Sequence, residues 1–220
     1  MKTIIFGSTG MVGKGVLLEC LDNNLVESIL VINRQSCTIT HPKLKEIIHS
    51  DMFDLSAIEQ ELKGYDTCFY CLGVSAAGLT EQTYHKMTYD LTIQTAELFL
   101  KLNTNFTFCY ISGQGSDSTE KGNIMWARVK GKTENKLISM PFAQAYIFRP
   151  GFIQPMRGIK SKTKLYNALY AIFSPLYFIL KHFDTFVTNT DTLGKAFVNV
   201  AIKGYDKKIL ESKDINIIGK

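Results

Sequence analysis

A glycine-rich segment near the start of the chain is of the kind that binds the pyrophosphate of a dinucleotide. An apolar run at 3–6 leads directly into residues 7–13, which read Gly-Ser-Thr-Gly-Met-Val-Gly. A strand that ends in closely spaced glycines and continues as a helix offers free N–H groups at the positive end of the helix dipole. We expect Gly7 to allow the tight turn, Gly10 to let phosphates approach, and Gly13 to let the helix pack closely. The expected contacts are Gly7, Ser8, Thr9, Gly10, Met11 and Val12.

Further candidate contacts follow the later apolar runs. The second run ends in Asn33-Arg34, and an arginine here pairs with the 2′-phosphate of NADP, whereas an acid would bind the ribose hydroxyls of NAD. NADPH is therefore favoured over NADH, the alternative being that Arg34 is only a solvated charge. Asp51 and Met52 suit the edge and face of adenine. The remaining expected contacts are Cys71, Leu72, Gly73, Ser112, Lys130, Pro150, Gly151, Phe152 and Ile153.

The elements that would position these residues alternate between strands and helices. This alternation predicts an α/β fold, a doubly wound parallel sheet (Rossmann fold) with a short C-terminal lid region. Ligands of such sheets bind at the carboxyl ends of the strands. Expected strands are 3–6, 28–33, 44–49, 65–72, 106–112 and 143–148, and expected helices follow residue 10 and cover 84–102, 124–139 and about 190–203. The tail, 208–220, is expected to add an edge strand and a helical turn.

Length and composition favour one domain. The 220 residues are 45% hydrophobic, with no Pro/Gly/Ser-rich linker. We expect a single dinucleotide-binding domain over 1–220, with 151–190 as the lid or substrate segment. The beginning lacks the features of a secretory signal, from which we expect a cytoplasmic location. The net charge of +5 arises from residue 157 onward, because the remainder holds 14 Lys and Arg against 15 Asp and Glu.

The cysteines and histidines do not form a ligand pattern. Five scattered cysteines do not resemble a disulfide framework, and we expect reduced thiols. Cys68 and Cys71 have redox-motif spacing, but positions i and i+3 of a strand point to opposite faces. The four histidines show no ligand spacing, so we expect no metal site.

Taken together, these features resemble the short-chain dehydrogenases/reductases, specifically the atypical branch with Gly-x-x-Gly-x-x-Gly. The chain looks most like the NADPH-binding, Tat-interacting oxidoreductase-like proteins. The shared features are segment 7–13, Arg34, Asp51, 71–73, 129–131, 148–151, and the tail 210–220. This resemblance implies a catalytic set of Ser and Tyr-x-x-x-Lys, in which tyrosine exchanges a proton with the substrate.

The chain departs from that catalytic set at its central position. Lys130 fits the lysine, which in the family lowers the tyrosine pKa and holds the nicotinamide ribose, but the residue four before it is Trp126. An indole N–H donates a hydrogen bond yet does not act as a general acid or base at accessible pH. Ser112 fits the serine, with Ser116 as an alternative. An exposed surface lysine remains the other interpretation of Lys130.

A basic aromatic stretch, 157–183, is the second unusual feature. Arg157 and three lysines precede the uncharged run 165–180, which holds five aromatic residues. That run is shorter than a bilayer span and contains Pro175, which argues against a transmembrane helix. The favoured interpretation is a substrate lid; the alternatives are a peripheral contact with an anionic membrane or a protein interface. No nucleic-acid-binding motif accompanies the basic residues.

Two functions remain open from the sequence. The first is an NADPH-dependent oxidoreductase acting on an unknown small carbonyl-type substrate, with Ser112 and Lys130 at the reacting end. The second is a catalytically silent, NADPH-sensing regulatory or protein-binding domain, for which Trp126 is no defect. The substrate and the oligomeric state do not follow from the sequence.

Overall fold

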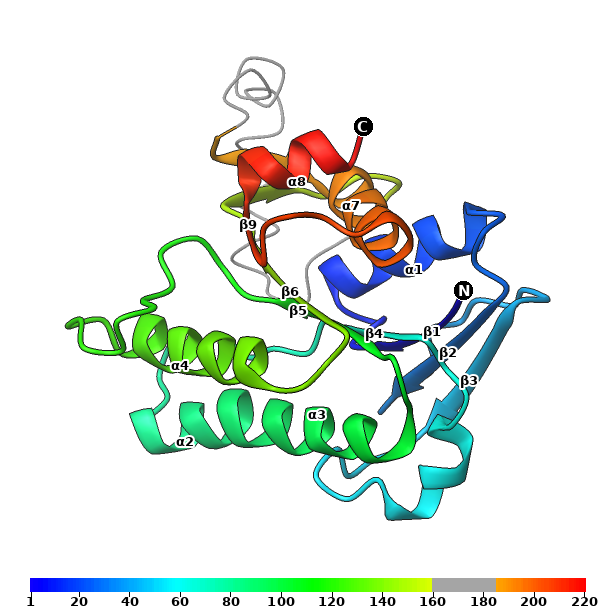
Figure 1. Ribbon diagram of the computed structural model, residues 1–220, viewed down its shortest axis with the longest axis horizontal. Coiled ribbons are helices and arrows are strands. Elements are labelled where there is room, and N and C mark those ends of the chain that lie inside the picture. The colour runs from blue at the N-terminus through cyan, green and yellow to red at the C-terminus, as the bar shows by residue number, and fades with distance from the viewer. Residues whose placement is uncertain (160–184) are drawn as a thin grey trace.

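The computed structural model describes residues 1–159 and 185–220, and its centre is a parallel sheet (Figure 1). Within the described residues this sheet has seven strands in the order β3-β2-β1-β4-β5-β6-β9. The chain runs outward from β1 to β3 and then returns to the other side of β1, so the strand order reverses between β1 and β4. Their bounds are β1 (Lys2–Phe6), β2 (Ser28–Asn33), β3 (Leu44–Ile48), β4 (Thr67–Tyr70), β5 (Thr107–Ile111), β6 (Gln144–Arg149) and β9 (Ile209–Glu211).

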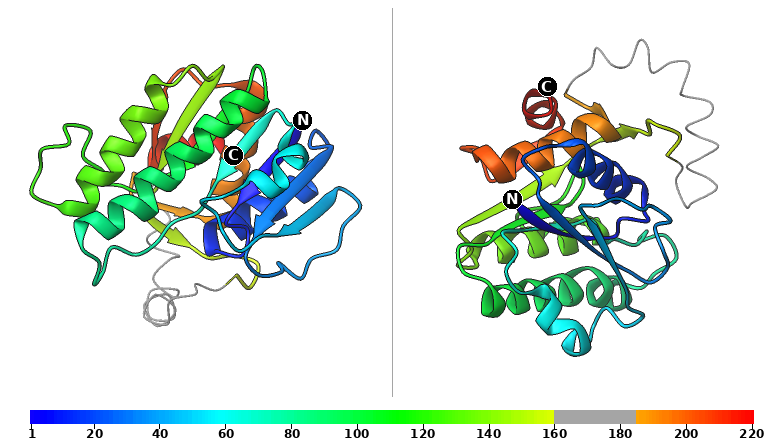
Figure 2. Two further views of the ribbon diagram at one scale, coloured as in Figure 1. Left: turned by 90° about the horizontal axis from the view of Figure 1, so that it is seen from below. Right: turned by 90° about the vertical axis from the view of Figure 1, so that its right-hand side faces the viewer.

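Helices cover both faces of the sheet, as Figures 1 and 2 show. One face carries α1 (Met11–Asp22), α7 (Thr190–Lys203) and α8 (Ser212–Ile218). The other carries α3 (Leu91–Leu102) and α4 (Met125–Ser139), together with α2 (Glu81–His85), the π-helical turn η2 (Lys86–Asp90) and the 3-10 helix η1 (Ser56–Leu62). The predicted doubly wound α/β fold is therefore confirmed.

Two apolar cores follow from the alternation of side chains along the buried strands. Ile5 and Val31 point to the side of α1 and α7, whereas Ile4 and Phe6 point to the side of α3. Because parallel strands covered on both faces must be apolar at every position, β1 and β2 read as continuous apolar runs. Cys68 and Cys71 likewise lie on opposite sides of the sheet, and all five cysteines are free thiols.

Helices α1 and α7 approach each other through glycines. A Cβ atom on Gly15 would lie 2.8 Å from the carbonyl oxygen of Thr190, and one on Gly194 would lie 2.8 Å from the carbonyl oxygen of Gly15. Side-chain atoms at either position would overlap backbone. The contact therefore fixes how α1 lies on its neighbour.

A second, two-stranded sheet was not predicted. It pairs β7 (Phe152–Gln154) with β8 (Val187–Asn189) in parallel. Strands of three residues, separated by a long stretch of chain, leave no periodic pattern to detect. The 3-10 helix η1 was also not predicted. The other strand and helix boundaries lie within three residues of those expected.

The basic aromatic stretch is described only at its beginning. Arg157 has a positive φ of 51° and pairs with carboxylates on α1 and α7: Nη1 lies 2.8 Å from Asp22, Nη2 3.2 Å from Glu19 and Nε 3.6 Å from Asp191. Its charge is therefore already matched by acids. The expected lid and the alternative membrane or protein contact otherwise fall on 160–184, outside the described residues. In the described ranges no helix has the length and apolarity to cross a bilayer.

Candidate dinucleotide and active site

The glycine turn between β1 and α1 has the backbone that its sequence predicts. Gly7 has a φ of +79°, and a Cβ atom there would lie 2.7 Å from the carbonyl oxygen of Cys71. A Cβ atom on Gly13 would lie 2.2 Å from the carbonyl oxygen of Gly7. Both positions thus need glycine because backbone from the turn or from the end of β4 occupies the space.

The amino end of α1 is suited to an anion. Gly10 is its N-cap, without a side-chain hydrogen bond to the helix, and the first turn contains no acidic residue. The first N–H groups of a helix have no partner within it and carry partial positive charge. Met11 and Val12 begin this turn, so their N–H groups provide the donors that a phosphate needs.

A cleft of about 460 Å³ lies at this turn, where the strand order reverses. Its walls come from the ends of β1, β2 and β4, as ligand sites of such sheets require. The lining residues that were expected are Gly7, Thr9, Gly10, Asn33, Arg34, Met52, Cys71, Leu72 and Gly73, and Ile32 and Gln35 are added to them.

Ser8 and Asn33 brace the cleft from within the protein. Both side chains are buried, and Ser8 Oγ donates to Asn33 Oδ1 at 2.9 Å. The Asn33 amide in turn donates to Glu46 Oε1 at 2.8 Å. Burial raises the pKa of Glu46, but hydrogen bonds from Ser36, Cys37 and Asn33 outweigh it and hold the pKa below its usual range. This carboxylate fixes the loop after β2.

Arg34 is exposed at the rim of the cleft. Among the described residues Arg34 forms no salt bridge. The Glu46 carboxylate accepts hydrogen bonds from Asn33 at the end of β2 and from Ser36 and Cys37 of the loop that follows. The end of β2 itself therefore presents the Arg34 cation, and the exposed carboxylate of Asp51 follows β3.

A smaller hollow of about 160 Å³ adjoins Arg34 and combines polar and apolar walls. Asp51 is exposed there, and its Oδ1 accepts the N–H of Phe53 at 2.9 Å. Met52 and Leu72 contribute to both hollows. A Cβ atom on Gly73 would meet no atom within 4 Å, so the backbone is open to a ligand at this point. This mixture fits a flat heteroaromatic ring with a polar edge.

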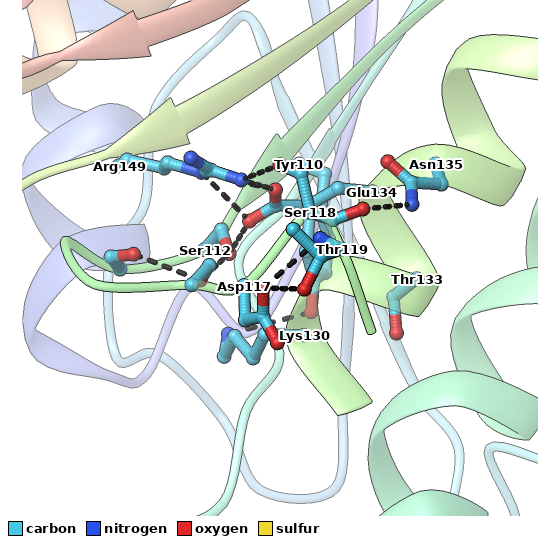
Figure 3. A network of polar contacts seen from close by, with 12 residues as sticks. Tyr110, Ser112, Asp117, Ser118, Thr119, Lys130, Thr133, Glu134, Asn135 and Arg149 are labelled. Carbon is cyan, nitrogen blue, oxygen red and sulfur yellow. Dashed lines mark hydrogen bonds and ion pairs between the residues drawn. The ribbon is translucent and has the colours of Figure 1, made fainter. Parts of the chain in front are cut away.

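A buried polar network lies at the ends of β5 and β6 (Figure 3). Its centre is Glu134 of α4, whose side chain is fully buried. Arg149 contacts both Glu134 carboxylate oxygens, and Nε lies 3.0 Å from Oε2. Ser112 Oγ donates to Glu134 Oε1 and lies 3.0 Å from Ser116 Oγ. The two serines that sequence reasoning could not choose between are therefore neighbours, and Ser112 contacts the carboxylate.

Lys130 lies one helical turn before Glu134 and points to the end of β5. Its Nζ donates to the Ile111 carbonyl at 3.2 Å and to the Tyr110 hydroxyl at 3.3 Å, and lies 5.0 Å from the Tyr110 ring centre. Burial lowers the pKa of Lys130 from 10.5 to about 8, partly offset by the negative charge of Glu134. The alternative of an exposed surface lysine is excluded by these contacts.

Trp126 packs against the serine-containing loop. Gly115 in that loop has a φ of +87°, and a Cβ atom there would lie 3.5 Å from Cη2 of the Trp126 ring. The indole therefore borders the loop between Ser112 and Ser116.

The four expected cofactor contacts after β6, Pro150 to Ile153, lie near the small two-stranded sheet and the start of α8. The N–H of Gly151 donates to Ser212 Oγ at 2.9 Å, and the Pro150 carbonyl accepts the N–H of Gln114 at 3.0 Å. Phe152 and Ile153 form β7 of the small sheet. In the described structure these four residues, Ser112 and Lys130 do not line the larger cleft.

Sequence reasoning missed Glu134, Glu46 and Tyr110. Glu134 had a detectable signal, because it lies on the buried stripe of α4 with Ala127 and Leu137, where a carboxylate requires a partner. Glu46 and Tyr110 had none, since their roles depend on neighbours distant in sequence.

Comparison with known proteins supports a common ancestry with two groups of relatives. No protein-family model matches the chain. Protein fmp52, mitochondrial, of Emericella nidulans is 27% identical over 213 residues, covering 93% of this chain and 89% of that protein. Protein HTATIP2 of Rattus norvegicus is 26% identical over 155 residues, covering 69% of this chain and 62% of that protein.

Solved structures show the same fold. The short chain dehydrogenase/reductase YIR035C of Saccharomyces cerevisiae superposes with a TM-score of 0.69 at 11% identity, covering 97% of each chain. The Bordetella bronchiseptica enzyme WbmF, solved in complex with NAD⁺, gives 0.67 at 13% identity, covering 98% of this chain and 76% of that one.

The names of the relatives contradict the predicted cytoplasmic location. Several Fmp52 proteins besides that of Emericella nidulans are named mitochondrial. The prediction was wrong because it depended on the absence of secretory features, which argues against secretion but does not distinguish among compartments within a cell.

Proposed function

We propose that the chain is an atypical member of the short-chain dehydrogenase/reductase group, binds NADPH and acts as an oxidoreductase on a small carbonyl-type substrate. Its fold and its similarity to the Fmp52 and HTATIP2 proteins support this. The observation that carries the proposal is the cleft at the reversal of strand order. There a glycine turn, the open amino end of α1 and the cation of Arg34 lie together.

The cleft and the adjoining hollow offer partners for three parts of the cofactor: the pyrophosphate, the adenine and the 2′-phosphate. The pyrophosphate would lie on the N–H groups of the first turn of α1, and adenine in the hollow beside Asp51 and Met52. Arg34 would pair with the 2′-phosphate that distinguishes NADPH from NADH. When bound, NADPH supplies the hydride; Ser112 and Lys130 would act at the carbonyl end.

Arg34→Ala tests the proposal. Hydrogen bonds to a charged group contribute roughly 1.5–3 kcal/mol, so we expect NADPH affinity to fall by about 10- to 100-fold while NADH affinity changes little. Fluorescence titration of each reduced cofactor measures both constants. Lys136→Ala, an exposed lysine of α4, is the matched control and should leave both constants unchanged. Equal loss for NADH and NADPH would contradict the assignment of Arg34.

Trp126 favours a second candidate, an NADPH-sensing domain without turnover. The indole does not supply the proton that the family's tyrosine exchanges. NADPH consumption with a panel of aldehydes, ketones and quinones discriminates between the two. Tight NADPH binding with no consumption supports the sensing function and contradicts the reductase.

A further inference from the structure

We propose that Lys130 is the proton donor to the substrate oxygen, taking the part that tyrosine performs in related enzymes. The inference rests on the proposed reductase function. It follows from what each of the three candidate donors around the end of β5 is doing in the structure: Trp126, Ser112 and Lys130.

Ser112 is committed as a donor within the protein. A serine hydroxyl has one hydrogen, and Ser112 Oγ donates it to the Glu134 carboxylate, which only accepts. Ser116 donates its own hydrogen to the Gly113 carbonyl at 2.8 Å. Ser112 therefore presents lone pairs to a ligand, and lone pairs do not stabilise a carbonyl oxygen that gains negative charge.

The Glu134–Arg149 pair holds this orientation in place. Glu134 is fully buried, while Arg149 contacts both carboxylate oxygens and also lies 3.5 Å from Glu211 and 2.6 Å from Ser118. Charge-assisted hydrogen bonds of this kind are strong, so the carboxylate is held where the Ser112 hydroxyl donates to it. Releasing the Ser112 hydrogen would leave Glu134 Oε1 with Arg149 Nε, at 3.2 Å, as its remaining donor.

Lys130 has a hydrogen to give. An ammonium carries three N–H donors, of which the Ile111 carbonyl and the Tyr110 hydroxyl take two. These contacts hold Nζ at the carboxyl end of β5, and within the described residues they leave its third N–H for a substrate oxygen. Two further groups set its charge: Glu134, from the same helix, favours the ammonium, and Arg149 of β6 neutralises Glu134. Burial lowers the pKa of Lys130 to about 8, close to the operating range of a general acid.

The proposed step balances. The carbonyl carbon gains a hydride from the reduced dinucleotide, and the π electrons of the C=O bond move to the oxygen. That oxygen takes a proton from the Lys130 ammonium and becomes a hydroxyl. Lys130 is left as a neutral amine and regains a proton from water.

The test compares Lys130→Arg, Lys130→Met, the control Lys136→Met and wild type. Phenanthrenequinone, benzaldehyde and acetophenone serve as carbonyl probes, and NADPH affinity is titrated for each protein. Arginine keeps the positive charge but does not release a proton, so we expect both Lys130 variants to lose about 100-fold or more in kcat. Lys136→Met, which replaces an exposed lysine on the same helix, should retain the turnover and the NADPH affinity of wild type. In the Lys130 variants the loss in kcat should exceed any loss in NADPH affinity.

A measurement independent of turnover completes the test. In protein labelled with ¹³C at the lysine ε-carbons, the signal lost in Lys130→Arg identifies Lys130, and it should titrate near pH 8. Titration in the ordinary lysine range, or turnover retained in Lys130→Arg, would overturn the inference alone. Wild type that binds NADPH but reduces no probe would overturn the inference together with the reductase function, and wild type that does not bind NADPH would overturn the proposed cofactor site.

Discussion

Burial of the Lys130 ammonium predicts a distinctive dependence of stability on pH. The pKa of Lys130 is lowered from 10.5 to about 8 in the folded protein. Between these values the unfolded chain binds more protons than the native one, so the free energy of unfolding rises as pH increases. One pKa unit corresponds to about 1.4 kcal/mol, and the folded protein should gain about 2–3 kcal/mol between about pH 7 and pH 10 from this group.

Lys130→Met removes that contribution. We expect urea unfolding to show wild type becoming more stable relative to Lys130→Met by about 2–3 kcal/mol over this pH interval. Lys136→Met, which replaces an exposed lysine on the same helix, controls for the general titration of lysines and tyrosines and should follow wild type. Parallel curves for wild type and Lys130→Met would refute the reasoning, because they would mean that folding does not desolvate this ammonium.

Two further predictions concern the glycine turn and the buried ion pair. Gly13→Ala places a Cβ atom 2.2 Å from the Gly7 carbonyl oxygen. We expect the free energy of unfolding in urea to fall by about 1–3 kcal/mol, and the rise in Tm on adding NADPH to be smaller than in wild type. An unchanged free energy of unfolding would contradict this packing. Glu134→Ala leaves Arg149 without its buried partner, so we expect the free energy of unfolding to fall by about 3–5 kcal/mol. The control Glu120→Ala, in an exposed loop, should change the free energy of unfolding little. Equal effects of the two substitutions would contradict the burial of the ion pair.

The sequence predicted the fold and the cleft well because both depend on local pattern. The apolar runs of β1 and β2 and the glycine spacing of 7–13 are properties of neighbouring residues, and they placed the turn, the strand ends and Arg34 together correctly. The same reasoning does not reach contacts between distant elements.

The polar network shows that limit. That Ser112 and Ser116 lie side by side, and that Ser112 donates to Glu134, depends on how α4 packs on β5. The spacing of apolar residues along the chain does not predict a contact between side chains that are distant in sequence. Lys130 lies on the helix expected over 124–139, but its contacts with Ile111 and Tyr110 emerge only in three dimensions.

The glycines of α1 and α7 bear on how a mutational scan of this chain should be interpreted. Gly13, Gly15 and Gly194 each lie where a Cβ atom would overlap backbone, so substitutions at all three should be strongly selected against. Gly13 contacts Gly7, which lines the candidate cofactor cleft, whereas Gly15 and Gly194 lie in the contact between α1 and α7. Positions of α1 that do not tolerate substitution would therefore reflect two separate constraints, the glycine turn beside the cleft and the packing of α1 on α7. A functional site inferred from such positions alone would include residues of α1 that serve only packing.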